Sequence, residues 1–259
     1  MFDLTGKVVL VAGGAGYLCT PVCKGLAEQG ASVMIADINS ERAAKLAQEI
    51  RPGISGGGHV KSIYLDAADG ASIKNSIAQT IQEFGKLDVL INATYKGHGK
   101  TWDEISIEEF DAALHTNVAS AFEYARQAYK VMPDGGNIIM FSSMYGLVAP
   151  DPRIYLPPMK PNAIEYGVCK AAILQMVKYL AVAWAPRNIR VNGIVPGPFP
   201  FPSGQQENPA FIERLASKVP LGRIGRQGEI AGAVIYLCSD EASYVTGQHI
   251  VVDGGWTIW

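Results

Sequence analysis

The sequence has little that would suit a nucleic-acid surface, a secreted scaffold or a membrane span. Its 22 Lys and Arg nearly balance its 24 Asp and Glu, and no basic run stands out, so no charge pattern favours nucleic acid or a membrane surface. No apolar run reaches the ~18 residues that a membrane-spanning helix needs. The first seven residues lack the charged and apolar regions of a signal peptide. We therefore expect no nucleic-acid partner and no membrane association.

Cysteine is also scarce. The four cysteines, Cys19, Cys23, Cys169 and Cys238, have neither a CxxC nor a zinc-finger spacing, so neither a disulfide framework nor a metal site is predicted. Cys19 and Cys23 could share a helix face, but two thiols without histidine partners are more typical of packing residues. A reduced, cytoplasmic protein is the natural expectation.

Apolar runs alternate with helical patterns along all 259 residues, which suits one large domain over 1–259. The runs are short and continuous, as in strands buried on both faces. This alternation predicts an α/β fold of the doubly wound, Rossmann type, a seven-stranded parallel sheet with helices on both faces. Strands are expected at 7–12, 32–36, 60–65, 87–92, 137–141, 189–195 and 249–252. Helices are expected up to 26 and at 40–50 (with Ser40 as N-cap), 71–84, 105–115, 118–132, about 163–184 and 229–238, and a surface loop at 53–58.

The first two strands enclose a glycine-rich turn, Gly13-Gly14-Ala15-Gly16, and the second strand is closed by Asp37. Glycines let the backbone approach a pyrophosphate, and the following helix offers unpaired N–H groups and the positive end of its dipole. Asp37 can accept hydrogen bonds from both hydroxyls of a ribose. A plain tight turn is the alternative, but strand, turn, helix and acid together predict a dinucleotide site.

A second pattern is Tyr166-Gly167-Val168-Cys169-Lys170. Residues four apart lie on one helix face, so the phenol and the ammonium point the same way. A free phenol titrates near pH ~10, and a neighbouring ammonium favours the phenolate and lowers that pKa. The pair is therefore a candidate proton donor and acceptor, if a hydride source is nearby. An ordinary helix that carries an aromatic residue and a lysine is the alternative.

Taken in order, these features resemble the short-chain dehydrogenase/reductase family over essentially the whole chain. The matching residues are Gly13, Gly14, Gly16, Asp37, Asp66, Asn92, Asn117, Ser143, Tyr166, Lys170, Pro196-Gly197 and Val251–Gly255. The resemblance implies that Tyr166 exchanges the proton with the substrate oxygen and that Ser143 hydrogen-bonds that oxygen. It implies that Lys170 lowers the pKa of Tyr166 and binds the nicotinamide ribose, while Asn117 holds a water that connects Lys170 to solvent.

The resemblance also implies a nicotinamide cofactor and an oligomer, a homotetramer or homodimer. The expected cofactor residues are Gly13, Gly16, Tyr17, Leu18, Asp37, Asp66, Ala67, Asn92, Ala93, Tyr166, Lys170, Pro196, Gly197 and Phe199. Asp37 would repel a 2′-phosphate, and Arg42, the nearest cation, is expected to face solvent, so NAD is expected rather than NADP. The apolar tail with Trp256 and Trp259 is expected to be buried at a subunit contact.

Some positions depart from the family pattern. Ala12 replaces a threonine, and Cys19 replaces the last glycine of the turn, which is expected to weaken pyrophosphate binding. The usual Asn-Asn-Ala-Gly is Asn92-Ala93-Thr94-Tyr95, so that Tyr95 is expected to face the active-site cleft. Pro198–Pro202 replaces a segment whose threonine would bind the carboxamide. These departures favour an alternative, a binding or regulatory protein that kept the fold and lost turnover.

The substrate is expected to be small and polar. Between Ser143 and Tyr166 lie 22 residues, about ten more than is usual in the family, and the proline-rich part, 149–161, predicts a stiff loop at the rim of the site. A sugar, sugar acid or polyol suits this rim, and the stretch resembles that of gluconate- and sugar-oxidising relatives. Packing of the loop against another subunit is the alternative. A nucleotide-sugar-modifying relative is a third reading, but the chain lacks their larger C-terminal domain. The candidate substrate residues are Tyr95, Met144, Arg153 and Tyr155.

Overall fold

Seven parallel strands form one sheet in the computed structural model, which describes residues 1–50 and 58–259. Apart from Gly58, the loop expected at 53–58 lies outside the described residues. The sheet order is β3-β2-β1-β4-β5-β6-β7, so the predicted fold is confirmed. The strands are β1 (Val8–Ala12), β2 (Ser32–Asp37), β3 (Val60–Tyr64), β4 (Val89–Asn92), β5 (Asn137–Phe141), β6 (Arg190–Pro196) and β7 (His249–Val252).

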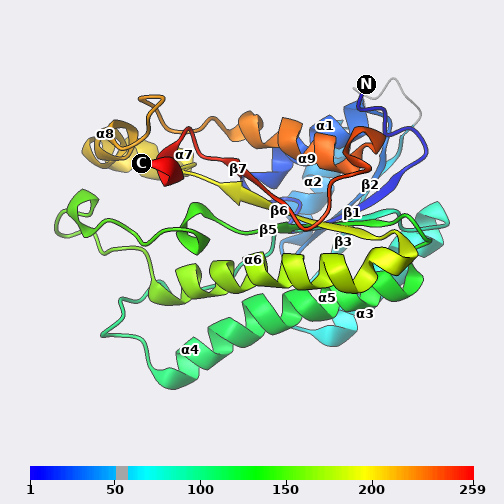
Figure 1. The fold of residues 1–259 in the computed structure, drawn as a ribbon, viewed down its shortest axis with the longest axis horizontal. Coiled ribbons are helices and arrows are strands. Elements are labelled where there is room, and N and C mark those ends of the chain that lie inside the picture. The colour runs from blue at the N-terminus through cyan, green and yellow to red at the C-terminus, as the bar shows by residue number, and fades with distance from the viewer. Residues whose placement is uncertain (51–57) are drawn as a thin grey trace.

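Helices cover both faces of this sheet (Figure 1). They are α1 (Cys19–Glu28), α2 (Ser40–Ile50), α3 (Gly70–Phe84), α4 (Ile107–Leu114), α5 (Ser120–Val131), α6 (Ile164–Trp184), α7 (Pro202–Glu207), α8 (Pro209–Ser217) and α9 (Ala231–Cys238). The sequence reading missed α7 and α8, and it placed the N-cap of α2 one residue late. Asn39 holds that position, because its side chain accepts the N–H of Arg42 at 2.9 Å.

Alternate residues of the strands pack into two separate cores. On one face Val9 and Val11 of β1 pack beneath α1, α2 and α9. On the other face Leu10 and Ala12 pack beneath α3, α5 and α6. Because side chains alternate along a strand and both faces are covered, both alternate sets are apolar, which is why the strands read as continuous apolar runs.

The stretch Ile164–Arg187, which contains α6, would be long and apolar enough to cross a membrane by length and composition alone. In this fold it is a layer of the domain instead. Ile173, Val177 and Leu180 pack into the core, and the charged Lys170 is buried at its N-terminal half. The opposite face of α6 also carries apolar side chains, and Val182 is 79% exposed. The high hydropathy therefore comes from two apolar faces, of which only one is covered within the protomer.

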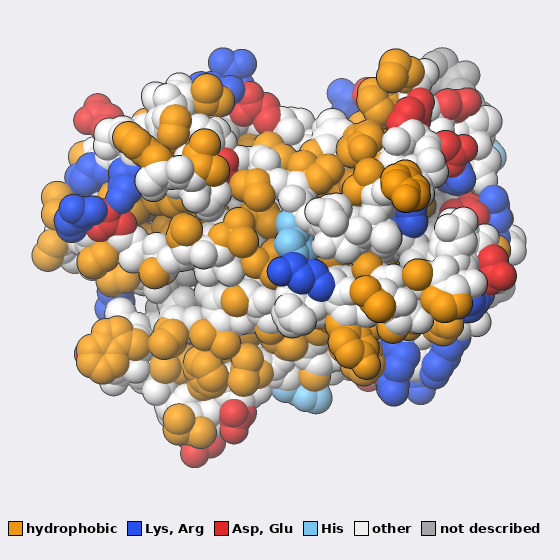
Figure 2. Space-filling view, in the orientation of Figure 1, with side chains coloured by type: hydrophobic (Ala, Val, Ile, Leu, Met, Phe, Trp, Pro, Cys, Tyr) orange, Lys and Arg blue, Asp and Glu red, His pale blue; other side chains and the backbone are white. Residues whose placement is uncertain are grey.

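The chain changes direction in the sheet between β1 and β4, and crevices for ligands form at such points, outside the carboxyl ends of the strands. Gly13 follows β1 and Ala93 follows β4, and a Cβ on Gly13 would lie 3.1 Å from the Ala93 oxygen. Figure 1 shows α7, α8, the C-terminus and the loop after β5 gathered at one end of the molecule, and the space-filling surface is hollowed there (Figure 2).

Candidate functional site

The glycine turn leaves its backbone bare where β1 meets α1. Gly13 has φ +75°, in the left-handed region that favours glycine, and a Cβ on Gly14 would lie 2.9 Å from the Val11 oxygen. No side chain caps the N-terminus of α1, whose N-cap residue is Leu18. A bare turn and an uncapped helix start are the features that a pyrophosphate requires, so these residues fit a dinucleotide.

Asp37 lies beneath this turn, at the end of β2. It is buried, and its Oδ2 accepts the N–H of Ala15 at 3.1 Å while its Oδ1 accepts the N–H of Asn39 at 3.0 Å. The Nη2 of Arg42 is 4.0 Å from Oδ1. Arg42 is exposed to solvent, as the sequence predicted, and its guanidinium also lies at the edge of ion-pair distance from Asp37. The carboxylate stays fixed in place for hydrogen bonds to ribose hydroxyls.

The remaining expected cofactor residues lie along the same carboxyl edge of the sheet. Asp66 and Ala67 follow β3, Asn92 and Ala93 end β4, and Pro196 and Gly197 end β6. Gly197 is tightly constrained, because a Cβ there would lie 2.4 Å from the Asp253 Cα. The Phe199 ring packs over Gly225. Tyr17 of the glycine turn contacts Phe201, with ring centroids 5.1 Å apart, so the turn and the segment after β6 meet at this edge.

Cys19, the departure at the third glycine position, is accommodated by the core. It is buried in the apolar cluster under α1, and burial raises the pKa of its thiol to about 12. All four cysteines are free and buried. Their packing role is therefore the one that the sequence suggested. Within residues 1–50 and 58–259, no cluster of three or more His, Cys, Asp and Glu side chains could hold a metal ion.

The structure brings Tyr166, Lys170 and Ser143 together where α6 crosses the end of β5. Lys170 is buried, and its Nζ donates to the Phe141 oxygen at 3.0 Å and lies 5.7 Å from the Tyr166 ring centroid. Ser143 follows β5 directly, and its Oγ accepts the N–H of Tyr145 at 3.2 Å. A hydroxyl, a phenol and an ammonium thus share one small volume.

The pKa values of these groups differ from the sequence prediction in one respect. Burial raises the pKa of Tyr166, and a side-chain hydrogen bond with Ser143 offsets part of that rise. The predicted lowering of this pKa is therefore wrong for the protein alone, because burial outweighs the favourable groups. Burial also lowers the pKa of Lys170, from 10.5 to about 8.

Asn117 lies in a π-helical turn, His115–Ala119, between α4 and α5. Such single turns occur often at functional sites. Its side chain holds the loop after β4, since Nδ2 donates to the Lys96 oxygen at 2.7 Å and Oδ1 accepts the Lys96 N–H at 2.9 Å. A cavity of about 10 Å³, the room that a single water needs, is lined by Asn117 and Lys170. The geometry suits the expected water, although the amide group itself is occupied by Lys96.

Aromatic side chains flank Tyr166 on two sides. The rings of Tyr95 and Tyr145 are both nearly perpendicular to it, with centroid distances of 4.8 Å and 6.5 Å. The Tyr145 hydroxyl is hydrogen-bonded to the Tyr155 hydroxyl at 2.8 Å. Tyr95 therefore lies beside the Tyr166 phenol, and Tyr155 lies one side chain further away. The sequence reading missed Tyr145, for which the only available signal was its place two residues after Ser143.

The expected substrate loop is largely irregular, with one short 3₁₀ turn at Pro152–Ile154. Arg153 is not free to grip a carboxylate. Its Nε is 2.9 Å from Oδ1 of Asp151 and its Nη2 is 2.8 Å from Oδ2. Asp151 also pairs with Lys218 of the segment after α8. Arg153 is thus one member of a charge network rather than an open cation.

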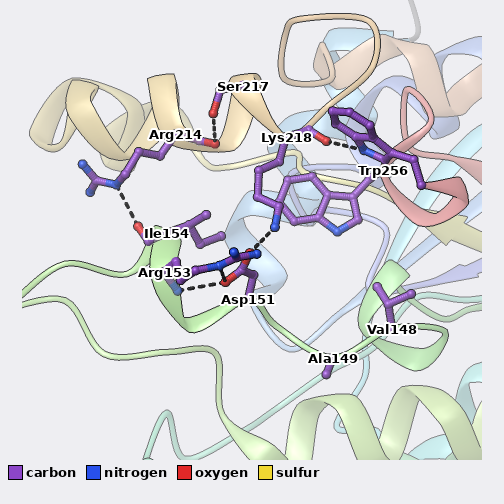
Figure 3. Close-up of a pocket in the computed structure, with 10 residues that line it drawn as sticks. Val148, Ala149, Asp151, Arg153, Ile154, Arg214, Ser217, Lys218 and Trp256 are labelled. Atoms are coloured by element: carbon purple, nitrogen blue, oxygen red, sulfur yellow. Dashed lines mark hydrogen bonds and ion pairs between the residues drawn. The ribbon is translucent and has the colours of Figure 1, made fainter.

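This network lines a hollow of about 600 Å³ beside α8 and the C-terminus (Figure 3). Arg214 lines it too, and its Nε donates to the Ile154 oxygen at 2.9 Å. In the described part of the chain, no carboxylate forms an ion pair with Arg214. The hollow therefore carries a net positive charge.

The tail and Met144 differ from the sequence prediction. Trp256 is only 7% exposed and packs with Met144, Tyr145 and Ile154 inside the protomer, so it needs no partner subunit to bury it. Met144 is buried in this cluster, beneath the site rather than at its surface. Trp259, in contrast to Trp256, is exposed, and its Nε1 donates to the Lys218 oxygen at 2.9 Å.

Known proteins are similar to this chain over nearly its whole length. The profile of a family described as "Enoyl-(Acyl carrier protein) reductase" matches residues 18–257. The chain is 36% identical over 257 residues to 2,5-dichloro-2,5-cyclohexadiene-1,4-diol dehydrogenase LinX of Sphingobium indicum, with 98% of each covered. It is 35% identical over 261 residues to cyclopentanol dehydrogenase of Comamonas testosteroni, with 99% of each covered. A solved short-chain type dehydrogenase/reductase from Mycobacterium marinum superposes with a TM-score of 0.86 at 31% identity, covering 100% of this chain and 98% of that one.

Proposed function

Because the chain belongs to the short-chain dehydrogenase/reductase family, we propose that it is an NAD(H)-dependent oxidoreductase that interconverts a secondary alcohol and a ketone. One observation carries the proposal: Tyr166, Ser143 and Lys170 meet at the carboxyl edge of the sheet whose glycine turn fits a dinucleotide. A proton-transfer group and a hydride carrier are what this reaction requires.

When bound, NAD would supply the hydride-accepting group and NADH the hydride-donating group for the alcohol and ketone carbon. The glycine turn would hold the pyrophosphate, Asp37 the adenine-side ribose, and Lys170 the nicotinamide ribose. Ser143 would hydrogen-bond the substrate oxygen and fix its position. During oxidation Tyr166 would act as the phenolate, stabilised by the ammonium of Lys170, and would become the neutral phenol when it takes the hydroxyl proton.

We propose NAD rather than NADP as the cofactor. Asp37 already accepts two backbone N–H groups, so its negative charge is held where a 2′-phosphate would sit. Arg42 is the one cation within 4.0 Å of Asp37 in the described chain, and its charge is shared with that carboxylate. Like-charge repulsion then disfavours the phosphate.

For the substrate we propose a small hydroxylated molecule such as a sugar, sugar acid or polyol-like alcohol. Three tyrosines, Tyr95, Tyr145 and Tyr155, surround the approach to Tyr166 and supply apolar faces with polar hydroxyl ends. The names of the diol and cyclopentanol dehydrogenases support an alcohol substrate of modest size. The positive hollow beside α8 would favour an acidic group at the far end of the substrate.

The test is a substrate panel with NAD and with NADP, followed through the absorbance of the reduced cofactor. Polyols, sugar acids, cyclic alcohols and bulky apolar alcohols are compared, with Tyr166→Phe as the inactive control. Turnover of small hydroxylated alcohols that is lost in Tyr166→Phe supports the proposal. Cofactor binding without turnover of any alcohol would favour a binding or regulatory protein instead.

We also propose that the protein assembles through the uncovered face of α6. Its exposed apolar residues recur at helical spacing, at Ile164, Val168, Tyr179 and Val182. Hydrophobic side chains gather over the helices of this layer in Figure 2. An apolar stripe of this kind on a long helix is typical of a subunit contact, which suits a homodimer or homotetramer.

A further inference from the structure

The loop after β4 is exposed from Tyr95 to Gly99 and has no helix or strand, yet two buried side chains fix it. Asn117 forms two hydrogen bonds with the backbone of Lys96. The second tether is Glu165, whose Oε1 accepts the N–H of His98 at 3.1 Å. A surface loop at the rim of the site is thus held from below at two points.

Glu165 is unusual because its side chain is costly to bury. It is 0% exposed, and its Oε2 has no hydrogen-bond partner in the part of the chain that the structure describes. A buried carboxylate with an unpaired oxygen lowers the stability of a protein. The dipole of α6 favours an acid in its first turn, but an exposed acid would meet that need equally well. Folding alone therefore does not account for Glu165, which directly precedes Tyr166.

The tethered loop gives Tyr95 a fixed position. Its ring centroid is 4.8 Å from that of Tyr166 and 5.4 Å from the Nζ of Lys170, and the residue as a whole is 39% exposed. Gly97 provides the space for it, since a Cβ there would lie 2.1 Å from the Tyr95 hydroxyl oxygen. The Tyr95 side chain thus lies beside the Tyr166 phenol and still has exposed surface.

We propose that Tyr95 is a specificity-determining wall that favours cyclic over open-chain secondary alcohols, and that Glu165 is the positioning residue that holds it. A ring alcohol can lay a flat face of C–H groups against the phenol while its hydroxyl reaches Tyr166. An open-chain alcohol must first lose the rotational freedom of its backbone to make the same contact. This inference rests on the proposed alcohol–ketone function and narrows its substrate to rings.

The test compares two vicinal secondary diols of six carbons, trans-cyclohexane-1,2-diol and hexane-3,4-diol, through the ratio of their kcat/KM values. Tyr95→Ala should lower the ring-to-chain ratio about tenfold, the equivalent of roughly 1.4 kcal/mol of lost packing, mainly through KM of the cyclic diol. Tyr95→Phe keeps the ring and should retain the ratio. Gly97→Ala leaves Tyr95 in the chain but displaces its phenol, and should act like Tyr95→Ala.

Glu165 is tested by its own pair of variants. Glu165→Ala should lower the ring-to-chain ratio of kcat/KM values as Tyr95→Ala does. Glu165→Gln keeps an acceptor for the His98 N–H and should therefore keep the wild-type ratio. Lys100→Met is the matched control, because it breaks the Lys100–Glu109 ion pair further along the same loop without touching either tether. If Glu165→Ala does not fold, Gly97→Ala and Glu165→Gln decide the question.

Binding gives a readout that is independent of turnover. Titration of trans-cyclohexane-1,2-diol into NADH-loaded protein should give a dissociation constant that rises in Tyr95→Ala and Gly97→Ala and not in Tyr95→Phe. Tyr95-dependent binding without turnover would reject the proposed function and keep the inference. A ratio and an affinity that stay within twofold in Tyr95→Ala and Gly97→Ala would overturn the inference, as would a failure of the cyclic diol to bind. Loss of turnover in Tyr166→Phe would still support the function.

Discussion

The rings of Tyr95 and Tyr166 stand at 88° to one another, with their centroids 4.8 Å apart. Perpendicular aromatic pairs at this distance are favourable beyond the area they bury. Tyr95 comes from an exposed loop and Tyr166 from a helix that packs on the core, so this contact joins a surface loop to the buried part of the site.

Replacing Tyr166 with Phe should lower turnover by about 10²-fold or more, because the ring packing stays and the transferable proton is lost. NAD affinity should stay near that of the wild type, as measured by fluorescence titration. Tyr179→Phe, on the exposed side of the same helix, is the control. A Tyr166→Phe enzyme with most of the wild-type rate would contradict the proposed mechanism.

Cofactor choice should depend on Asp37. The wild type is expected to have a higher kcat/KM with NAD than with NADP, and Asp37→Ala should reverse or abolish this preference, since repulsion is removed and Arg42 becomes free to pair with a 2′-phosphate. The double variant Asp37→Ala/Arg42→Ala should lose the gain with NADP. Equal efficiency of the wild type with both cofactors would count against the assignment.

Lys170 should leave a signature in the pH dependence of stability. Burial lowers its pKa from 10.5 to about 8, so between these values the folded protein binds fewer protons than the unfolded chain. The free energy of unfolding should therefore rise with pH across this window, by up to about 3 kcal/mol for this group. Lys170→Met should lack the rise. Denaturant titrations at pH 7.5 and 10 give the free energy of unfolding of both proteins. If it changes equally with pH in the wild type and in Lys170→Met, the lowered pKa of Lys170 is refuted.

The uncovered face of α6 predicts assembly. Tyr179→Asp combined with Val182→Asp should convert the wild-type oligomer to monomers, because two charges would enter an apolar contact. Sedimentation velocity at micromolar concentration measures this. A wild-type protein that sediments as a stable monomer would refute the proposed interface.

The positive hollow predicts a difference between two arginines. Arg214 has no ion pair in the described chain, whereas Arg153 is bound by Asp151. Arg214→Ala should therefore raise KM for a sugar acid more than Arg153→Ala does, with NAD affinity unchanged in both. The reverse order, or no effect from either substitution, would exclude a substrate role for this hollow.

Most strands could be predicted because they contain short apolar runs, of which Val8–Ala12 of β1 is the clearest, as a strand buried on both faces requires. The edge strand β3 is less regular, since it carries Lys61 and Ser62. The short helix α7 could not, because Pro202–Glu207 contains one proline and otherwise only small and polar residues, with no apolar periodicity. Helix α8 was missed although Asn208 caps its N-terminus and Pro209 begins it. At the site, the spacing of four residues on one helix predicted that Tyr166 and Lys170 lie on the same face. Nothing in the sequence distinguished Glu165 from an ordinary acid in a first helical turn, because its burial depends on a loop seventy residues earlier.

Tertiary contacts also decided which expectations failed. Trp256 was expected at a subunit contact because two tryptophans at a terminus suggest an exposed patch, but folding returns it to Met144 and Tyr145. Arg153 was expected to be open because its proline-rich loop runs between Ser143 and Tyr166 at the rim of the site, but Asp151, two residues earlier, pairs with it. The order of charges along a chain does not say which of them pair.

The position of Asn117 in the site depends on the extra residue in the π-helical turn His115–Ala119. This turn contains one residue more than a turn of regular α-helix, and it separates α4 from α5 by that increment. Deleting a single residue there would restore regular hydrogen bonding and make a better helix. It would also remove the bulge that directs the Asn117 side chain to Lys96, so the two hydrogen bonds between these residues should be lost. A regular helix at 115–119 would therefore no longer hold the loop after β4 beside Tyr166.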